Sequence, residues 1–116
     1  MTTRESGETC VMTSVKSRDE VRTAGRVIAW ADSVVEGQDD GPHLHVRVQV
    51  VSGHLPIGTR RGLLDDVRRR ASAARIHTAS FAIPLGDSEM LVVLREQWHE
   101  VTTRAAGSTC LVTATF

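Results

Sequence analysis

The sequence predicts a two-layer sandwich of the α/β or α+β class, in which a β-α-β-α-β core lays its helices on one face of a mixed sheet. Three segments alternate apolar and polar residues with the period of a strand, and two amphipathic segments of helical period lie between them. The 116 residues are 41% hydrophobic and 24% charged, which suffices for one domain with an aliphatic core. We therefore expect a single domain over residues 1–116, with residues 1–8 as a flexible N-terminal tail.

The first forty residues are compatible with two structures. Residues 9–15 have the composition of a short strand, and Ser17 with Glu20 forms a capping box ahead of an apolar stripe of helical spacing that ends at Gly37. Against a helix, Gly25 lies in its middle, and residues 26–35 could instead be a strand joined to the next by a turn at 38–41. We favour a strand followed by a helix and keep a β-hairpin as the alternative.

The middle of the chain changes period twice. Residues 43–51 alternate apolar with polar side chains and predict a half-buried strand. Residues 59–74 then place apolar side chains on one helical stripe, and Thr59 is positioned to cap that helix. Residues 78–85 return to the period of a strand, with Ala79, Phe81 and Ile83 on one side.

The C-terminal part predicts one long helix and one strand. Asp87 or Ser88 caps a helix whose apolar stripe runs from Met90 to Ala105, and Gly107 follows as a natural residue to end it. Residues 109–116 alternate and are rich in residues with high strand propensity. Because every predicted strand has one polar side, we expect both helices on one sheet face and the other face open to water, a second copy or a ligand.

Charge offers one candidate ligand site. The formal net charge is zero, which gives the whole molecule no attraction to nucleic acid or to an anionic membrane. Arg61, Arg68 and Arg75 are nevertheless seven residues apart on the predicted helix, with Arg60 beside them. These four arginines are candidates for binding an anion, a phosphate, a nucleic acid or an acidic protein partner. A solvated helix face whose arginine stems cover the core edge is the more ordinary explanation.

Two further features suggest sites. His43 and His45 share one strand face and could bind a metal with Asp39 or Asp40, although Arg47 beside them would repel a cation. Val92 and Val93 lie off the apolar stripe of the last helix. They are either an apolar patch for a partner or a second copy, or are covered by the N-terminal segment.

No catalytic motif and no cofactor fingerprint is recognisable, so no catalytic residue and no cofactor is predicted. The leading functional prediction is a small non-enzymatic binding or interaction module that self-associates, for example as a homodimer. Anion, phosphate or nucleic-acid binding through the arginines is one alternative, and a small enzyme using the His43 and His45 face is another. Since the sequence has no secretory signal pattern and no apolar run long enough for a membrane span, we expect a cytoplasmic protein.

Overall fold

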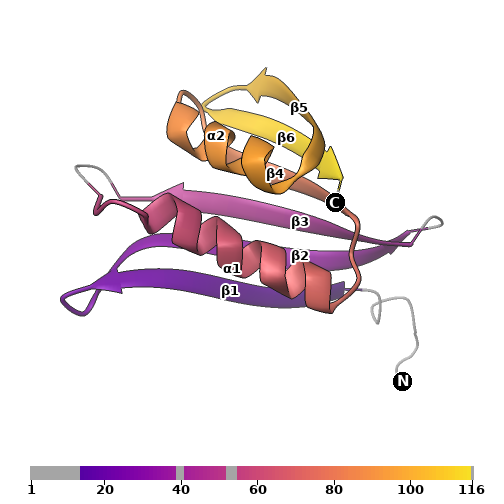
Figure 1. Ribbon diagram of the computed structural model, residues 1–116, viewed down its shortest axis with the longest axis horizontal. Helices are drawn as coiled ribbons and strands as arrows, with labels where there is room; N and C mark the ends of the chain where they lie inside the picture. Colours follow the sequence, from indigo (N-terminus) through magenta and orange to yellow (C-terminus); the bar gives the residue numbers. More distant parts are fainter. Residues whose placement is uncertain (1–13, 39–40, 52–54, 116) are drawn as a thin grey trace.

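The computed structural model describes residues 14–38, 41–51 and 55–115, and within them the chain forms six strands and two helices. Figure 1 shows their arrangement. In chain order they are β1 (Ser14–Thr23), β2 (Arg26–Gln38), β3 (Gly41–Val50), α1 (Thr59–Ala73), β4 (Thr78–Pro84), α2 (Ser88–Gln97), β5 (His99–Ala106) and β6 (Thr109–Thr115).

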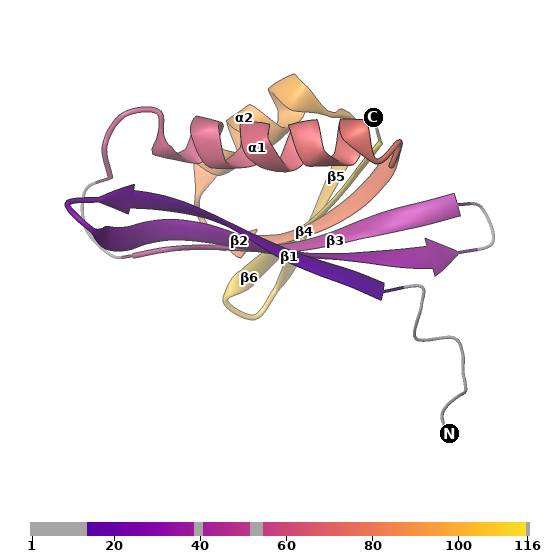
Figure 2. The ribbon, with the colours of Figure 1, turned by 90° about the horizontal axis from the view of Figure 1, so that it is seen from below.

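The strands form one mixed sheet in the order β1-β2-β3-β4-β6-β5. Only β3 and β4 are parallel, and α1 makes the crossover between them. Both helices cover the same face of the sheet, as the edge-on view in Figure 2 shows. The predicted two-layer class, with helices on one face of a mixed sheet, is confirmed.

The core fills the space between the sheet and the helices. Phe81 at its centre is 1% exposed and meets the ring of Trp98 edge-on, with 5.5 Å between ring centroids. Alternate residues of β2, β3, β4 and β6 face the helices because successive side chains of a strand point to opposite sides. The other large fully buried hydrophobic side chains are Leu44, Leu63, Leu64, Ile76, Ile83, Met90, Leu94, Val48, Val67 and Val112.

The helix favoured for residues 17–37 is wrong, and the hairpin alternative is correct. β1 and β2 pair antiparallel, and the chain reverses at Ala24 and Gly25, whose φ angles are 52° and 79°. Two successive positive φ angles are the signature of the tight hairpin turn in which glycine is favoured. Gly25, which weakened the helix prediction, is therefore the residue that makes this turn.

The long C-terminal helix is also shorter than predicted. α2 ends at Gln97, Trp98 is already extended, and residues 99–106 form the edge strand β5. The β-branched run at Val101, Thr102 and Thr103 explains the change, since such side chains favour strands over helices. Gly107, expected to end the helix, instead lies in the β5–β6 hairpin turn with φ 64°.

Smaller features of the two helices also differ from expectation. Gly58, not Thr59, is the residue before the first turn of α1, and the Thr59 hydroxyl donates to the Pro56 carbonyl. Asp87 caps α2 as predicted. Val93 is 3% exposed and belongs to the core, so of the two valines only Val92 is at the surface. No helix within the described ranges is long and apolar enough to cross a membrane.

Candidate functional site

The open face of the sheet is organised in rows of cross-strand neighbours. One row joins Val34, His45, Ser80 and Thr113. The next row toward the carboxyl ends of β3 and β4 joins Asp32, Arg47, Ala82, Leu111 and Arg104. Both rows line a groove of about 750 Å³ on the side of the sheet away from the helices.

His43 lies on the same sheet face, one row beyond the groove, and is held on both ring nitrogens. Its Nδ1 is 2.8 Å from the Thr78 hydroxyl oxygen, and its Nε2 is 2.8 Å from the Ser80 hydroxyl oxygen. The His45 ring lies next to it, with 4.7 Å between ring centroids. The two hydroxyls fix the orientation of His43, which in turn packs against His45.

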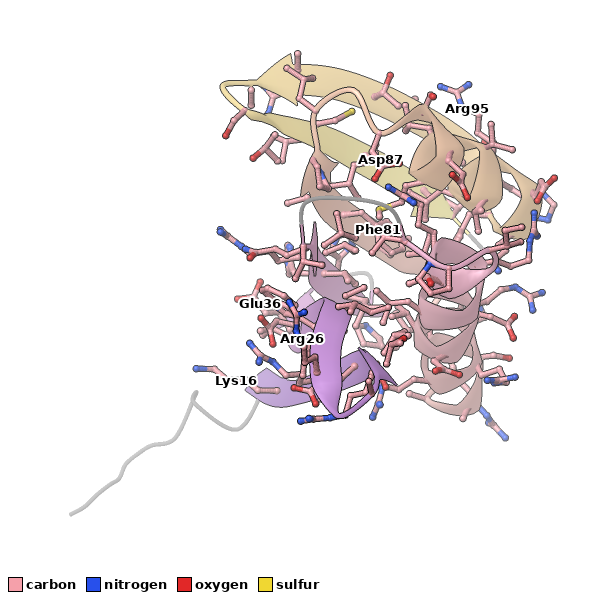
Figure 3. All side chains as sticks on the ribbon, turned by 90° about the vertical axis from the view of Figure 1, so that its left-hand side faces the viewer. Lys16, Arg26, Glu36, Phe81, Asp87 and Arg95 are labelled. Carbon is pink, nitrogen blue, oxygen red and sulfur yellow. The ribbon has the colours of Figure 1, made fainter. Side chains whose placement is uncertain are left out.

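His45 is oriented by a carboxylate. Its Nε2 is buried and lies 2.8 Å from Glu36 Oε1, at an angle that makes an ion-pair contact but not a well-aligned hydrogen bond. Figure 3 shows Glu36 on the side of the sheet away from α1. A carboxylate beside Nε2 favours the tautomer with the proton on that atom, which leaves the Nδ1 lone pair of His45 able to accept a proton.

Asp32 lies in the groove but is already bound. The Arg18 guanidinium donates to both carboxylate oxygens, at 2.6 and 3.1 Å, and this hydrogen bonding lowers the pKa of Asp32 against the opposing effect of partial burial. The charges of Arg18 and Arg47 lower that pKa further. Asp32 therefore stays ionised in the groove, paired with Arg18 and affected by the charge of Arg47 only through space.

A gap opens where β3 and β4 separate. The two strands pair only from His43 with Thr78 to Arg47 with Ala82, although β3 continues to Val50 and β4 to Pro84. A cavity of about 190 Å³ lies between the separated ends and shares Arg47 and Ala82 with the groove. The gap and the groove are thus adjacent, and ligands of open α/β sheets bind at this end of parallel strands.

The start of α1 lies beyond the same strand ends. Gly58 takes φ 87°, no side chain caps the helix, and its first turn contains no acidic residue. The first N–H groups of any α-helix lack partners within the helix, so those of Arg60 and Arg61 point toward the loop. An uncapped helix start of this kind favours a phosphate or another anion.

The four predicted arginines mostly tie α1 to α2. Arg60 Nε lies 2.9 Å from both carboxylate oxygens of Asp87, Arg61 is 2.6 Å from Glu96, and Arg68 donates to the Gln97 carbonyl. Arg75 is exposed at the end of the helix, with φ 57°. The carboxylates of Asp87 and Glu96 neutralise at least part of the positive charge that was expected to bind an anion. Anion binding at these arginines stays a prediction.

The predicted metal site is only partly described. His43 and His45 do lie together, but the residues that the structure describes contain no group of three or more ligating side chains suited to a metal. Asp39 and Asp40, the expected third ligands, lie outside the described residues. The structure places Glu36 beside His45. Glu36 was not predicted as a partner because residues 17–37 were expected to form a helix.

Asp87 connects the starts of the two helices. It accepts a hydrogen bond from the Met90 N–H and holds Arg60, while being only 8% exposed. We expect Asp87→Ala to lower the free energy of unfolding by roughly 2–3 kcal/mol, because both the helix cap and a charge-assisted contact are lost. Asp87→Asn keeps the capping oxygen and should lose about half as much. Urea unfolding of both variants measures this, and equal losses would contradict the capping role.

No known family model matches the sequence, and no curated protein resembles it closely enough to count as a relative. Solved structures do share its fold. A ribosomal-protein-alanine N-acetyltransferase from Brucella melitensis is 15% identical with a TM-score of 0.62, covering 87% of this chain and 68% of its own. A GNAT-family acetyltransferase from Streptococcus pneumoniae is 8% identical with a TM-score of 0.64, covering 87% and 65%. One from Elizabethkingia anophelis, with acetyl-CoA bound, is 11% identical with a TM-score of 0.57, covering 92% and 78%.

The chain has the fold of the GNAT acetyltransferases. It spans about two thirds of the length of the first two of these structures. The similarity contradicts the leading functional prediction, a non-enzymatic interaction module, because the three structures named above are acetyltransferases. The alternative of a small enzyme is the better supported of the two, and its placement on the His43 and His45 face stays a prediction.

Proposed function

We propose that the chain is a cytoplasmic acetyltransferase that uses acetyl-CoA. The thioester would lie in the gap between β3 and β4, and the acceptor amine in the groove of the open face. The observation that carries this proposal is the continuity of the two cavities, which share Arg47 and Ala82. Neighbours with this fold include a protein with acetyl-CoA bound, which supports the choice of acetyl donor.

The residues at the strand ends fit this donor. Val48 to Val50 on β3 and Ile83 on β4 have backbone groups that the two strands do not share with each other, and the amides of an extended chain can pair with such groups. The uncapped start of α1, where the N–H groups of Arg60 and Arg61 have no acceptor within the helix, suits a diphosphate. When bound there, acetyl-CoA supplies an activated acetyl group on a sulfur that leaves readily.

His45 would act as the general base. It lies one cross-strand row from Arg47 and Ala82, where the groove meets the gap. Glu36 holds Nε2, so Nδ1 would take the proton that the acceptor amine loses on attack. The Ser80 and Thr113 hydroxyls in the same row could hydrogen-bond the acceptor and align its nitrogen with the thioester.

Calorimetric titration of acetyl-CoA into the protein tests the donor site. Ser108 is exposed and lines the gap, so Ser108→Trp should fill it and weaken acetyl-CoA binding by about 5- to 150-fold, the cost of about 1–3 kcal/mol for a misplaced bulky group. Ser72→Trp, at an exposed position on α1, is the matched control and should bind like the wild type. Wild-type protein that does not bind acetyl-CoA at millimolar concentration would refute the proposed function, and equal binding by Ser108→Trp would place the donor elsewhere.

A further inference from the structure

Two arginines lie in one row across the floor of the groove. Arg47 on β3 pairs with Ala82, Ala82 with Leu111, and Leu111 with Arg104 on β5. Neighbouring strands are about 4.8 Å apart, so the two arginines begin roughly 14 Å from each other. Between them lie only the methyl group of Ala82 and the side chain of Leu111. Arginine side chains that lean inward from both ends would meet over this apolar floor.

These two arginines differ from most others in their pairing. Arg18, Arg22, Arg60, Arg61, Arg69 and Arg70 all have an acidic side chain within ion-pair distance. Within residues 14–38, 41–51 and 55–115, Arg47 and Arg104 have none, and both are exposed. The acid closest in register to Arg47 is Asp32, whose two oxygens accept hydrogen bonds from Arg18 and whose charge acts on Arg47 through space, without an ion-pair contact. The groove therefore carries excess positive charge in a protein whose formal net charge is zero.

The other residues that line the groove indicate which further chemical groups a ligand should have. Val34 and Leu111 offer apolar surface, and Ser80 and Thr113 offer hydroxyls one row away from the arginines. A guanidinium group binds a carboxylate through two parallel hydrogen bonds, which a neutral group cannot form. A molecule with a carboxylate and a small apolar body thus matches the charge and the surface of the groove.

We propose that the groove binds a free amino acid with an apolar side chain, whose carboxylate lies between Arg47 and Arg104. The assignment of this molecule as the acetyl acceptor rests on the proposed function, whereas the binding of its carboxylate does not. With the carboxylate over Ala82, one strand and one row from His45, the amine would point toward His45 and the start of the gap.

Binding is tested without acetyl-CoA, by titrating ¹⁵N-labelled protein with N-acetyl-leucine and with N-acetyl-leucinamide and following amide shifts by NMR. The two probes differ in the carboxylate alone. One charge-assisted hydrogen bond corresponds to roughly 10- to 100-fold in affinity. We expect N-acetyl-leucine to bind at least tenfold more tightly than its amide, with shifts concentrated in β3, β4, β5 and β6. Arg104→Gln should lower this preference below about tenfold, because only Arg47 remains, and Arg95→Gln, at an exposed arginine of α2, should keep it.

Equal affinity for the two probes, or an unchanged preference in Arg104→Gln, would overturn the carboxylate site. Absence of binding by either probe at tens of millimolar would also overturn it. Acetyl transfer to leucine and to leucinamide then separates the two proposals. A protein that prefers N-acetyl-leucine but does not bind acetyl-CoA keeps the carboxylate site and loses the proposed function. A protein that acetylates leucinamide as readily as leucine keeps the function and loses the acceptor class.

Discussion

Replacing His45 with glutamine is expected to lower the turnover number of acetyl transfer by about 100- to 10,000-fold, the usual contribution of a general base. The substitution removes the only atom proposed to take the proton of the amine, Nδ1, and glutamine offers no base in its place. The side chain is 43% exposed, so the fold should tolerate the change. Release of the CoA thiol with saturating acetyl-CoA and amine measures the effect.

His43→Gln is the informative comparison, because His43 lies on the same strand face but both of its ring nitrogens contact hydroxyl groups. We expect a loss of less than about tenfold there, since its role is to position His45 rather than to take the proton. Glu36→Gln should fall between the two, because glutamine can still contact Nε2 without a charge. A larger loss in His43→Gln than in His45→Gln would assign the base to His43 and contradict the present account.

Replacing Phe81 with alanine is expected to lower the free energy of unfolding by about 3–5 kcal/mol, the range observed for truncating a buried phenylalanine. The side chain is 1% exposed and packs edge-on against Trp98, so the substitution removes both the buried ring and an aromatic pair. Figure 3 places Phe81 between the sheet and the helices. Since a small domain is stable by only about 5–15 kcal/mol, this loss is a large share of the total.

Guanidinium chloride unfolding of Phe81→Ala against wild type measures this loss. Val92→Ala is a suitable control because Val92 is an apolar residue of α2 that is 54% exposed, and its truncation should change stability by less than about 0.5 kcal/mol. A loss below about 1 kcal/mol in Phe81→Ala would mean that the ring is not enclosed as described.

The fold class could be predicted because three strands and α1 have strong periodicity. Leu44, Val46 and Val48 alternate without interruption, and this alternation also predicted the open face that carries the groove. The predicted boundaries of helices and strands were wrong where a segment was compatible with both the helical and the strand period. Residues 26–35 form an apolar run that is compatible with a helical stripe. They form a strand because they pair with β1 on one side and β3 on the other.

The candidate site was found only in part, for a physical reason. His43 and His45 share one strand, so a two-residue spacing was enough to place them on one face. Their partners come from other strands: Glu36 from β2 and Ser80 from β4, and Arg104 of the same groove comes from β5. The register between strands brings these residues together, and no local pattern encodes it. Glu36 and Arg104 were moreover hidden in segments expected to be helical.

The gap between β3 and β4 could likewise not be predicted from the sequence. It depends on where two parallel strands stop pairing, and both Val48 and Ile83 continue the apolar alternation beyond that point. The side chains therefore give no sign that the backbones separate. Only the three-dimensional register reveals it.

The central claim is that acetyl-CoA binds between the separated ends of β3 and β4, next to the groove. An NMR titration of the ¹⁵N-labelled protein with acetyl-CoA tests it most directly. The account predicts the largest amide shifts at Val48 to Val50, at Ile83 and in the first turn of α1 at Thr59 to Arg61, with smaller shifts at Arg47 and Ala82. Shifts confined to the exposed arginines at the far end of α1, or the absence of any shift at millimolar acetyl-CoA, would contradict it.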